Sequence, residues 1–318
     1  MTPVPAPANT ARPARPDFEP EPKSALERVL LVVFVVVPFL SVLAAVPLAW
    51  AAGWLGWSDA VVFAVFYVVS GLGVTVGFHR YFTHGSFKAR RPLRIALAIA
   101  GSLSLEMSVT DWVATHRRHH KHSDAKGDPH SPWRFGTDWK ALTKGLFFAH
   151  VGWLFSSERI NRAKYAPDLV EDKAITALHR YFPWLVVGSL LVPALLGGLL
   201  SWSWWGALTA FFWASLVRIS LLHHVTWSIN SVCHVFGKLQ FTTRDRSRNV
   251  WWLAIPSFGE SWHNLHHADP TCARHGALRG QLDPSARVIR WFEQLGWAYD
   301  VRWPNPERLA AKRVTASA

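Results

Sequence analysis

The stretch AVVFAVFYVVSGLGVTVGFHRYFTH, residues 60–84, joins a long apolar run directly to a pair of histidines. A helix needs about 20 apolar residues to cross a bilayer, and residues 60–78 approach that length without a charged side chain. Residues 29–50, 182–200 and 204–222 have the same character, and the last run contains Arg218 near its end. The sequence therefore predicts an all-α membrane protein with four transmembrane helices.

Charge placement predicts the orientation of these helices. The connections at residues 51–59 and 201–203 contain no Lys or Arg, so nearly all basic residues lie in the N-terminal segment, in residues 79–180 and after residue 222. By the positive-inside rule, both termini and the long middle segment are cytoplasmic. A fifth, shorter run at residues 95–109 contains Glu106, and we interpret it as an interfacial or buried helix. A fifth span would place the basic middle segment and the basic C-terminal segment on opposite sides of the membrane, against the positive-inside rule.

Composition limits the remaining organisation. Residues 1–28 are rich in proline and predict a disordered N-terminal tail, followed by a membrane domain over residues 29–300 and a C-terminal tail over residues 301–318. The two cysteines, Cys233 and Cys272, form no CxxC motif and predict no disulfide framework. A net charge of +13 suits nucleic acid or an anionic membrane surface, and the apolar runs favour the membrane, so no nucleic-acid partner is expected.

Histidines carry the chemical signal. None precedes residue 79, and three clusters stand out: HRYFTH, HRRHH and HNLHH. On a helix, positions i, i+3 and i+4 share one face, so each HxxHH motif predicts three imidazoles that converge on one volume. The spacing of five between His79 and His84 does not hold one face, which indicates either that the helix ends between them or that they serve different metals. The clusters comprise His79, His84, His116, His119, His120, His263, His266 and His267.

Eight imidazoles exceed what one ion accepts, so the residues alone predict two transition metals, with zinc, copper, nickel or iron all suitable. Soluble di-iron bundles use Glu-x-x-His pairs, and only Glu260 with His263 matches that spacing. The histidines outside the clusters are interpreted as hydrogen-bonded or solvated side chains: His122, His130, His150, His179, His223, His224 and His275.

Around the clusters, the stretches HRYFTHGSFKARRPLR, HHKHSDAKGDPHS, FFAHVGWLF, WSINSVCHVFG, GESWHNLHH and LGWAYD resemble the membrane acyl-CoA desaturases of the stearoyl-CoA type, over about residues 30–300. The resemblance implies a cytoplasmic helical cap that holds two non-haem irons. It implies the eight cluster histidines and His234 as ligands, with Asn230 acting through water. It also implies O2 as co-substrate and a cis double bond, at Δ9, in a saturated acyl-CoA. Because the tails contain neither paired haem histidines nor a cysteine cluster, a separate ferredoxin or cytochrome b5 type donor with its reductase is expected.

The resemblance also suggests substrate residues. Trp112 and Thr226 match positions at the bend of an acyl tunnel, and Trp227 matches one that packs on the CoA adenine. At three places the chain differs from the animal members of the family. Ala114 with Thr115, and Ser157 with Glu158, replace basic pairs that contact CoA phosphates, and Glu106 replaces a Gln near the bend. Arg159, Arg162 or Lys164 could substitute for the missing cations, so the sequence leaves the head group open.

Two other functions are compatible with parts of the pattern. The same metal chemistry could hydroxylate a lipid or an alkane, and product analysis separates an alcohol from a double bond. A metal-binding membrane transporter would instead need ionisable residues along an ion path inside its spans. The four apolar runs are almost free of such residues, which favours the desaturase.

Overall fold

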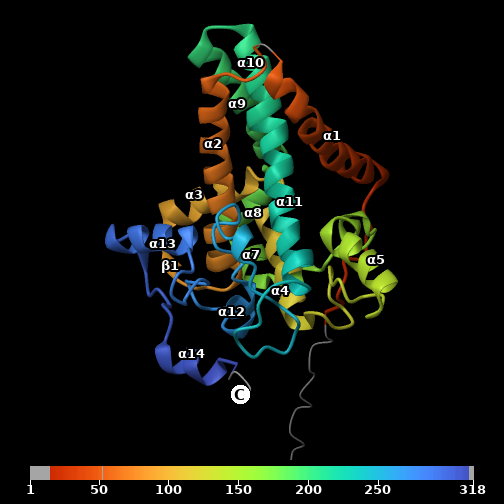
Figure 1. Cartoon of the computed structure of the whole chain (residues 1–318), viewed down its shortest axis with the longest axis vertical. Helices are drawn as coiled ribbons and strands as arrows, with labels where there is room; N and C mark the ends of the chain where they lie inside the picture. The colour runs from red at the N-terminus through yellow and green to blue at the C-terminus, as the bar shows by residue number, and fades with distance from the viewer. Residues whose placement is uncertain (1–14, 52, 315–318) are drawn as a thin grey trace, which may run out of the picture.

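The structure, a computed structural model, describes residues 15–51 and 53–314. Long helices stand together at one end of the molecule, and shorter helices form a cap at the other end (Figure 1). Four helical segments are long and apolar enough to cross a membrane, which confirms the predicted number: Ala25–Trp50, Trp57–Thr83, Phe182–Ser201 and Trp204–His234.

Two of these segments continue past the predicted apolar runs by changing helix type. The second consists of α2 (Trp57–Leu72) and a π-helix, η1 (Gly73–Thr83). The fourth consists of α10 (Trp204–Ala210), the π-helix η3 (Phe211–Val217), α11 (Arg218–Ser231) and the short 3₁₀ helix η4 (Val232–His234). The first and third are the single helices α1 (Ala25–Trp50) and α9 (Phe182–Ser201). The extensions carry His79 and His234 out of the apolar bundle and into the cap.

The N-terminal segment differs from the predicted tail over residues 1–28. Residues 1–14 lie outside the described part, but α1 already begins at Ala25, because Ser24 and Glu27 form a capping box that satisfies free amides of the first turn. The preceding residues run antiparallel to residues 157–161. The Lys23 amide donates to the Ser157 carbonyl at 3.0 Å, and Phe18 bridges to Ile160.

The cap is assembled from segments on both sides of the third and fourth spans. A short antiparallel pair, β1 (Lys88–Ala89) with β2 (Ala298–Tyr299), ties the residues after the second span to the C-terminal part. The cap helices, with 3₁₀ turns named η, are α3 (Arg91–Ser102), α4 (Val109–His122), α5 (Trp139–His150), η2 (Gly152–Phe155), α6 (Arg162–Tyr165), α7 (Pro167–Val170), α8 (Lys173–Arg180), η5 (Trp251–Leu253), α12 (His263–Ala268), α13 (Pro284–Gln294) and α14 (Pro306–Lys312).

The fifth apolar run, residues 95–109, is not a single helix. It comprises the end of α3, an irregular segment at residues 103–108 and the first residue of α4. The helix α3 packs closely on η1, since a Cβ on Gly73 would lie 2.1 Å from the amide nitrogen of Gly101. The prediction that this run does not span the membrane is confirmed, although the helix ends earlier than expected.

A buried arginine fixes the irregular segment that follows α3. Arg218 lies in the middle of the fourth span, and it donates to the Leu103 carbonyl at 2.9 Å and to the Ser189 hydroxyl at 2.8 Å. Ser189 itself donates to Leu103, and His223 bonds the Ser104 carbonyl. An ionisable side chain inside a membrane helix usually marks a special role. Here that role is to hold the segment 103–108, which carries Glu106, against the spans.

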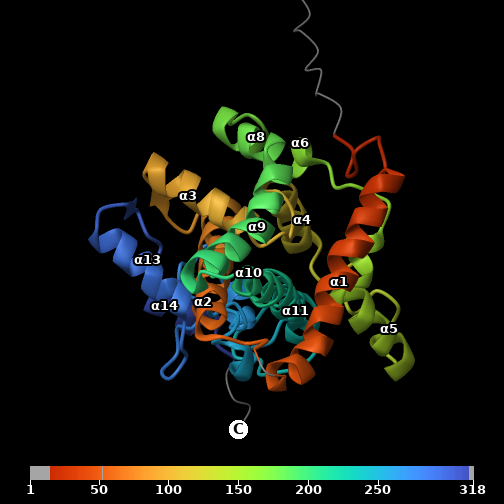
Figure 2. The ribbon, with the colours of Figure 1, turned by 90° about the horizontal axis from the view of Figure 1, so that it is seen from above.

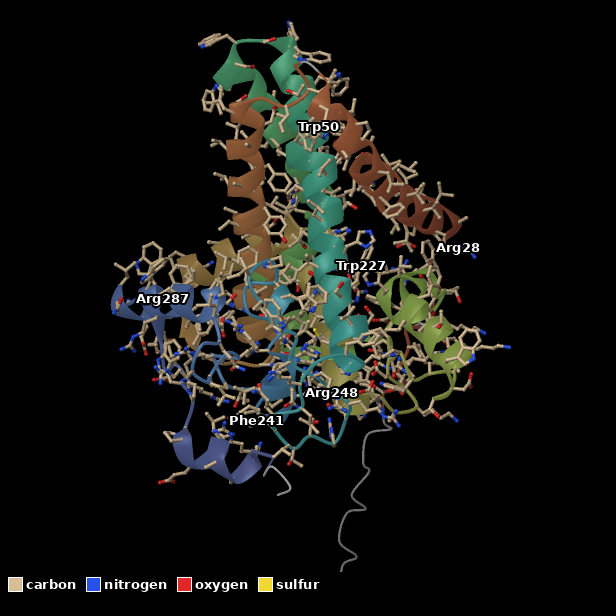
Figure 3. All side chains as sticks on the ribbon, viewed as in Figure 1. Arg28, Trp50, Trp227, Phe241, Arg248 and Arg287 are labelled. Carbon is tan, nitrogen blue, oxygen red and sulfur yellow. The ribbon has the colours of Figure 1, made fainter. Side chains whose placement is uncertain are left out.

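The side-chain distribution separates the two ends of the molecule. Seen from above, α1 stands at one side of a group formed by α2, α9, α10 and α11 (Figure 2). The upper helices carry mainly carbon, and nitrogen and oxygen gather around the cap (Figure 3). Along α1, Arg28 lies at the cap end and Trp50 at the far end, as expected for a helix whose basic end meets a membrane surface.

Candidate metal centre

Nine histidines meet in the cap and divide into two groups, in each of which the candidate ligand atoms lie within 4.8 Å of one another. The first group comprises His79, His84, His116, His120 and His266. The second comprises His119, His234, His263 and His267. The three sequence clusters and His234 therefore come together in space, although they come from η1, α4, η4 and α12. Two groups of this size can hold two metal ions.

Each HxxHH motif serves both groups, which differs from the predicted convergence on one volume. In α4, His116 and His120 belong to the first group and His119 to the second. In α12 the assignment is reversed: His263 and His267 belong to the second group and His266 to the first. The cause is helix geometry. Residues four apart point about 40° apart, whereas residues at i+3 and i+4 diverge by about 100°. One short helix can therefore face two adjacent sites.

The spacing of five in HRYFTH is explained by the π-helix. The helix η1 ends at Thr83, between His79 and His84, and the His84 amide still bonds the His79 carbonyl at 3.2 Å. Such i to i+5 bonds widen the turn, so residues five apart approach the same face. The interpretation that the helix ends between the two histidines agrees with the end of η1 at Thr83. Both side chains join the first group, so the alternative, that they serve different metals, differs from the observed grouping. Single π-turns are frequent at functional sites.

The separations of the imidazole nitrogens fit metal coordination. His79 Nε2 lies 3.0 Å from His266 Nε2, and His266 Nε2 lies 2.9 Å from His120 Nε2. In the second group, His263 Nε2 lies 3.0 Å from the Nε2 atoms of both His234 and His267. With a metal–nitrogen bond of about 2.1 Å, a separation near 3.0 Å corresponds to about 90° at the metal, whereas a tetrahedral site would require about 3.4 Å. Separations near 3 Å are short enough for these nitrogens to bind a common metal ion.

Carboxylates fix which nitrogen of each ring faces the site. His119 Nδ1 bonds Asp128 at 3.0 Å, and His234 Nδ1 bonds Asp124 at 2.9 Å. His267 bonds Asp245 at 2.7 Å in the same way, and His79 bonds Glu260. A neutral ring that donates from Nδ1 turns the lone pair of Nε2 inward, and this carboxylate–histidine arrangement is typical of metal sites. The four carboxylates are Asp124, Asp128, Asp245 and Glu260.

Without a cation this arrangement would be unfavourable. The lone pairs of His234 and His267 both face His263 Nε2, which has at most one hydrogen to offer. His84 Nε2 and His119 Nε2 are buried without a hydrogen-bond partner. Burial lowers the pKa of His116, His263 and His266 well below its usual range, which favours the neutral form that binds metals. The donor set therefore fits two divalent ions, whose charge the four carboxylates would balance.

Sequence reasoning missed the residues around the two groups. His275 lies 3.6 Å from Glu260, and His130 approaches Asp128 at 3.8 Å, although both were interpreted as bystanders. No spacing rule would have found Asp124, Asp128 and Asp245. Glu260 was noted for its Glu-x-x-His spacing to His263, but the histidine that it bonds is His79. His150 and His224 bond each other at 2.9 Å away from the two groups, and His179 bonds Ser108, as the bystander interpretation predicted.

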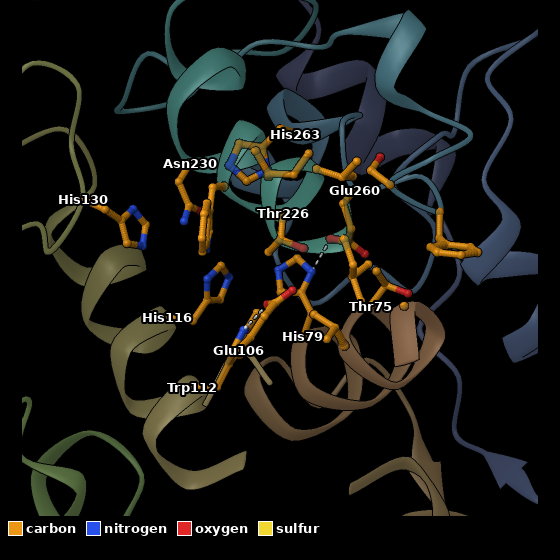
Figure 4. A pocket seen from close by; sticks show the side chains of 18 of the residues that line it. Thr75, His79, Glu106, Trp112, His116, His130, Thr226, Asn230, Glu260 and His263 are labelled. Carbon is orange, nitrogen blue, oxygen red and sulfur yellow. Dashed lines mark hydrogen bonds and ion pairs between the residues drawn. The ribbon is translucent and has the colours of Figure 1, made fainter. Parts of the chain in front are cut away.

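A pocket runs from the spans to both histidine groups (Figure 4). Its walls include His79 and His116 of the first group and His263 of the second. Much of the remaining lining is apolar and comes from η1 and its preceding turn, α4, α11 and residues 256–258. The residues that the resemblance assigned to substrate and water binding all line it: Trp112, Thr226, Trp227 and Asn230. A chain-like apolar ligand in this pocket would pass beside ligands of both groups.

The irregular segment 103–108 contributes a carboxyl group, that of Glu106, to the lining of the pocket. Its Oε2 accepts from Trp112 Nε1 at 3.1 Å, and its Oε1 is buried without a partner among the described residues. Its neighbours Leu105 and Met107 have φ values of 62° and 150°, so the backbone is strained on both sides. Burial raises the pKa of Glu106 to about 7, although the neighbouring Thr226 hydroxyl and Trp112 indole oppose the rise.

This pKa predicts a pH dependence of stability. In the unfolded chain Glu106 ionises near pH 4.5, and in the folded protein near 7. Folding is therefore favoured at low pH, and the free energy of unfolding should fall as the pH rises between these values, by roughly 3 kcal/mol in total. Glu106→Gln keeps the hydrogen bonds and should lose this component. Thermal unfolding in detergent from pH 5 to 8 measures it, and parallel curves for the two proteins would contradict the prediction.

Comparison with known proteins agrees with this geometry. Residues 53–279 match the family model "Fatty acid desaturase". The chain belongs to the fatty acid desaturase family, as the resemblance of its histidine clusters implied.

The relatives extend the match over most of the chain. A hex-5-enoyl-(acyl-carrier protein) acetylenase of Moorena producens (strain JHB) is 39% identical over 88% of this chain and 87% of its own length. The delta-9 acyl-lipid desaturase 1 of Arabidopsis thaliana is 38% identical, over 78% and 77% of the two chains. An sn-1 stearoyl-lipid 9-desaturase of Anabaena variabilis is 35% identical, over 75% and 81%. The similarity therefore covers the spans as well as the cap.

Proposed function

We propose that this chain is an O2-dependent desaturase that introduces a cis double bond, at Δ9, into a saturated acyl chain. The observation that carries the proposal is the pocket, whose wall contains ligands of both histidine groups beside largely apolar residues of the spans. The nine histidines are proposed to hold two irons, with Asn230 acting through water. Iron rather than zinc is supported by the redox inactivity of zinc, which could not take part in an oxidation by O2.

The chemistry requires a metal because the reacting CH2–CH2 pair is unactivated. One turnover consumes O2, two electrons and two protons, and it converts the pair into CH=CH with release of two water molecules. When bound, the iron pair supplies the oxidising power for both hydrogen removals. The protein's own side chains orient the acyl chain and exclude water. Trp112 and Thr226, joined through Glu106, form the wall where the chain would pass the histidines.

The head group is proposed to be that of a membrane lipid rather than CoA. The three cations that could have met CoA phosphates are engaged by the N-terminal segment. Lys164 pairs with Asp17 at 2.5 Å, Arg162 with Glu19 at 3.5 Å, and Arg159 with Glu27. Hydrogen bonds from Lys164 and Tyr165 lower the pKa of Asp17 to about 2, so this carboxylate is charged. The names of the Arabidopsis thaliana and Anabaena variabilis relatives specify acyl lipids and support the same choice, whereas the name of the Moorena producens relative specifies an acyl-carrier protein.

The cap and both termini are proposed to be cytoplasmic, in a multi-pass membrane protein. The support is the basic composition of the cap and the absence of Lys and Arg from the two short connections at the far end. Electrons are proposed to come from a separate ferredoxin or cytochrome b5 type carrier with its reductase.

Expression in a host that lacks its own desaturase tests the proposal. We expect monounsaturated chains in membrane lipids, with the double bond at a constant distance from the carboxyl end as chain length varies. An apolar tunnel discriminates each methylene by only about 1–3 kcal/mol, so length selectivity should be graded while the position stays fixed. An alcohol as the product would favour the hydroxylase alternative, and a position fixed from the methyl end would contradict the tunnel geometry.

The purified protein separates the head groups. With lipid-linked and CoA-linked stearoyl chains supplied at equal concentration, we expect desaturation of the lipid. The triple variant Asp17→Asn, Glu19→Gln, Glu27→Gln releases Arg159, Arg162 and Lys164 and should gain salt-sensitive binding of CoA. Glu307→Gln, an exposed change on α14, is the control. Faster reaction of the CoA ester in the unchanged protein would support the acyl-CoA specificity expected from sequence.

A further inference from the structure

A surface hollow on the cap reaches one histidine of each metal group. It lies between the end of α4, residues 242–245 and the end of α12, and its floor contains His120 and His267. His120 belongs to the first group and is half-buried. His267 belongs to the second group, and its side chain is 1% exposed, so its ring lies just beneath the floor. The two rings stack with centroids 4.6 Å apart. This hollow, called the His120–His267 hollow below, is lined by one ligand of each group, with the His267 ring stacked beneath that of His120.

The rim of the hollow is positively charged. The exposed Arg244 donates to the His120 carbonyl, and Lys312 donates to the Ala268 carbonyl. The nearby carboxylates are already engaged: Asp245 accepts from His267 at 2.7 Å, and Asp269 pairs with Arg308 at 2.9 Å. The hollow therefore offers cations to an approaching partner, with its acidic groups turned toward the protein.

The position of the hollow also leaves it accessible. The helices α12 and α14 lie at the foot of the cap, away from the far ends of the spans (Figure 1). The pocket is lined by His79, His116 and His263 and by residues of the spans, whereas the hollow is lined by His120 and His267. Substrate and a protein partner could therefore occupy the molecule at the same time.

We propose that the His120–His267 hollow is the docking site of the electron donor, and that this donor is an acidic protein that carries single electrons on a haem or iron–sulfur group. The inference rests on the proposed function, because the desaturase reaction needs two electrons in each turnover. Through this hollow an electron reaches the edges of ligands of both groups without crossing the acyl pocket. The carrier delivers its two electrons in successive encounters. Charge complementarity steers such encounters and makes them sensitive to salt.

Charge reversal tests the docking site. The full-length protein in nanodiscs is titrated with two acidic probes, a plant-type ferredoxin and the soluble domain of cytochrome b5, and turnover is measured with each probe and with reduced methyl viologen. Arg244→Glu and Lys312→Glu should each weaken binding of the effective probe about tenfold at low salt, with the difference shrinking at high salt. Turnover with the viologen should stay unchanged. Arg287→Glu, the same charge change on α13 (Figure 3), is the matched control.

The outcomes separate the docking site from the proposed function. If both rim variants bind the probe like the unchanged protein, or if only Arg287→Glu loses binding, the docking site is overturned. If both rim variants also lose turnover with the viologen, they act on the metal site and the docking role is overturned as well. If the unchanged protein forms no desaturated lipid even with the viologen, the proposed function fails, while the binding comparison still reports on the hollow.

Discussion

His120→Ala should abolish desaturation, by about 100-fold or more, while the protein still folds and inserts. His120 Nε2 lies 3.1 Å from His116 and 2.9 Å from His266, so its loss removes one side of the first group. Losing a ligand weakens metal binding and changes the redox behaviour of what remains. The side chain is half-buried at the surface hollow, so the apolar core is untouched and thermal stability should change little. Product formation and metal content, measured on the same preparation, check this result.

The matched control for this variant lies on the same helix. His122→Ala also removes an imidazole from α4, but His122 belongs to neither group. It should keep both activity and metal. Equal losses from the two variants would mean that the division of the histidines into ligands and bystanders is wrong.

Glu260→Gln should lower activity or metal affinity by about 10–100-fold, the usual cost of removing the carboxylate that orients a histidine ligand. Glu260 bonds His79 Nδ1, and its other oxygen lies 3.3 Å from the buried Arg80. Glutamine preserves the size of the side chain and removes its charge, so the fold should be retained. Excess iron should restore part of the activity, because the defect lies in binding. Iron titration with activity as a second readout measures both effects.

The control for Glu260 is Glu171→Gln, the same change on an exposed side chain. It should leave the iron titration unchanged. An iron affinity for Glu260→Gln that equals that of the unchanged protein would contradict an orienting role for this carboxylate.

The spans and the histidine clusters were predictable because each depends on local spacing. An apolar run of membrane length and an HxxHH motif are complete within a few consecutive residues. The number of spans is confirmed, and all eight cluster histidines lie in the two groups. His234 joins the second group as well, but only the family resemblance pointed to it, since a single histidine carries no spacing signal.

Features that depend on contacts between distant segments could not be predicted. Asp124 and His234 are separated by 110 residues. Glu260 bonds His79 although the third and fourth spans lie between these two residues in the sequence. The π-helix η1 could not be predicted, because a run of apolar residues has no polar face from which the number of residues per turn could be recognised. The division of each HxxHH motif between two groups follows from where the neighbouring segments lie, which the motif itself does not record.

The N-terminal segment illustrates the same limit. Its proline content predicts a tail, yet Asp17, Glu19 and Glu27 pair with cations more than 130 residues away. Because these pairs engage the cations that could have bound CoA phosphates, the proposed head group is that of a membrane lipid and not CoA. Local composition describes how a segment behaves alone, and its partners decide whether it is ordered in the protein.

The metal content of active, purified protein tests the central claim most directly. The account predicts two irons per chain in a preparation that desaturates lipid-linked stearoyl chains, with activity proportional to iron when metal is removed and restored. One zinc per chain, or an active preparation without iron, would contradict it.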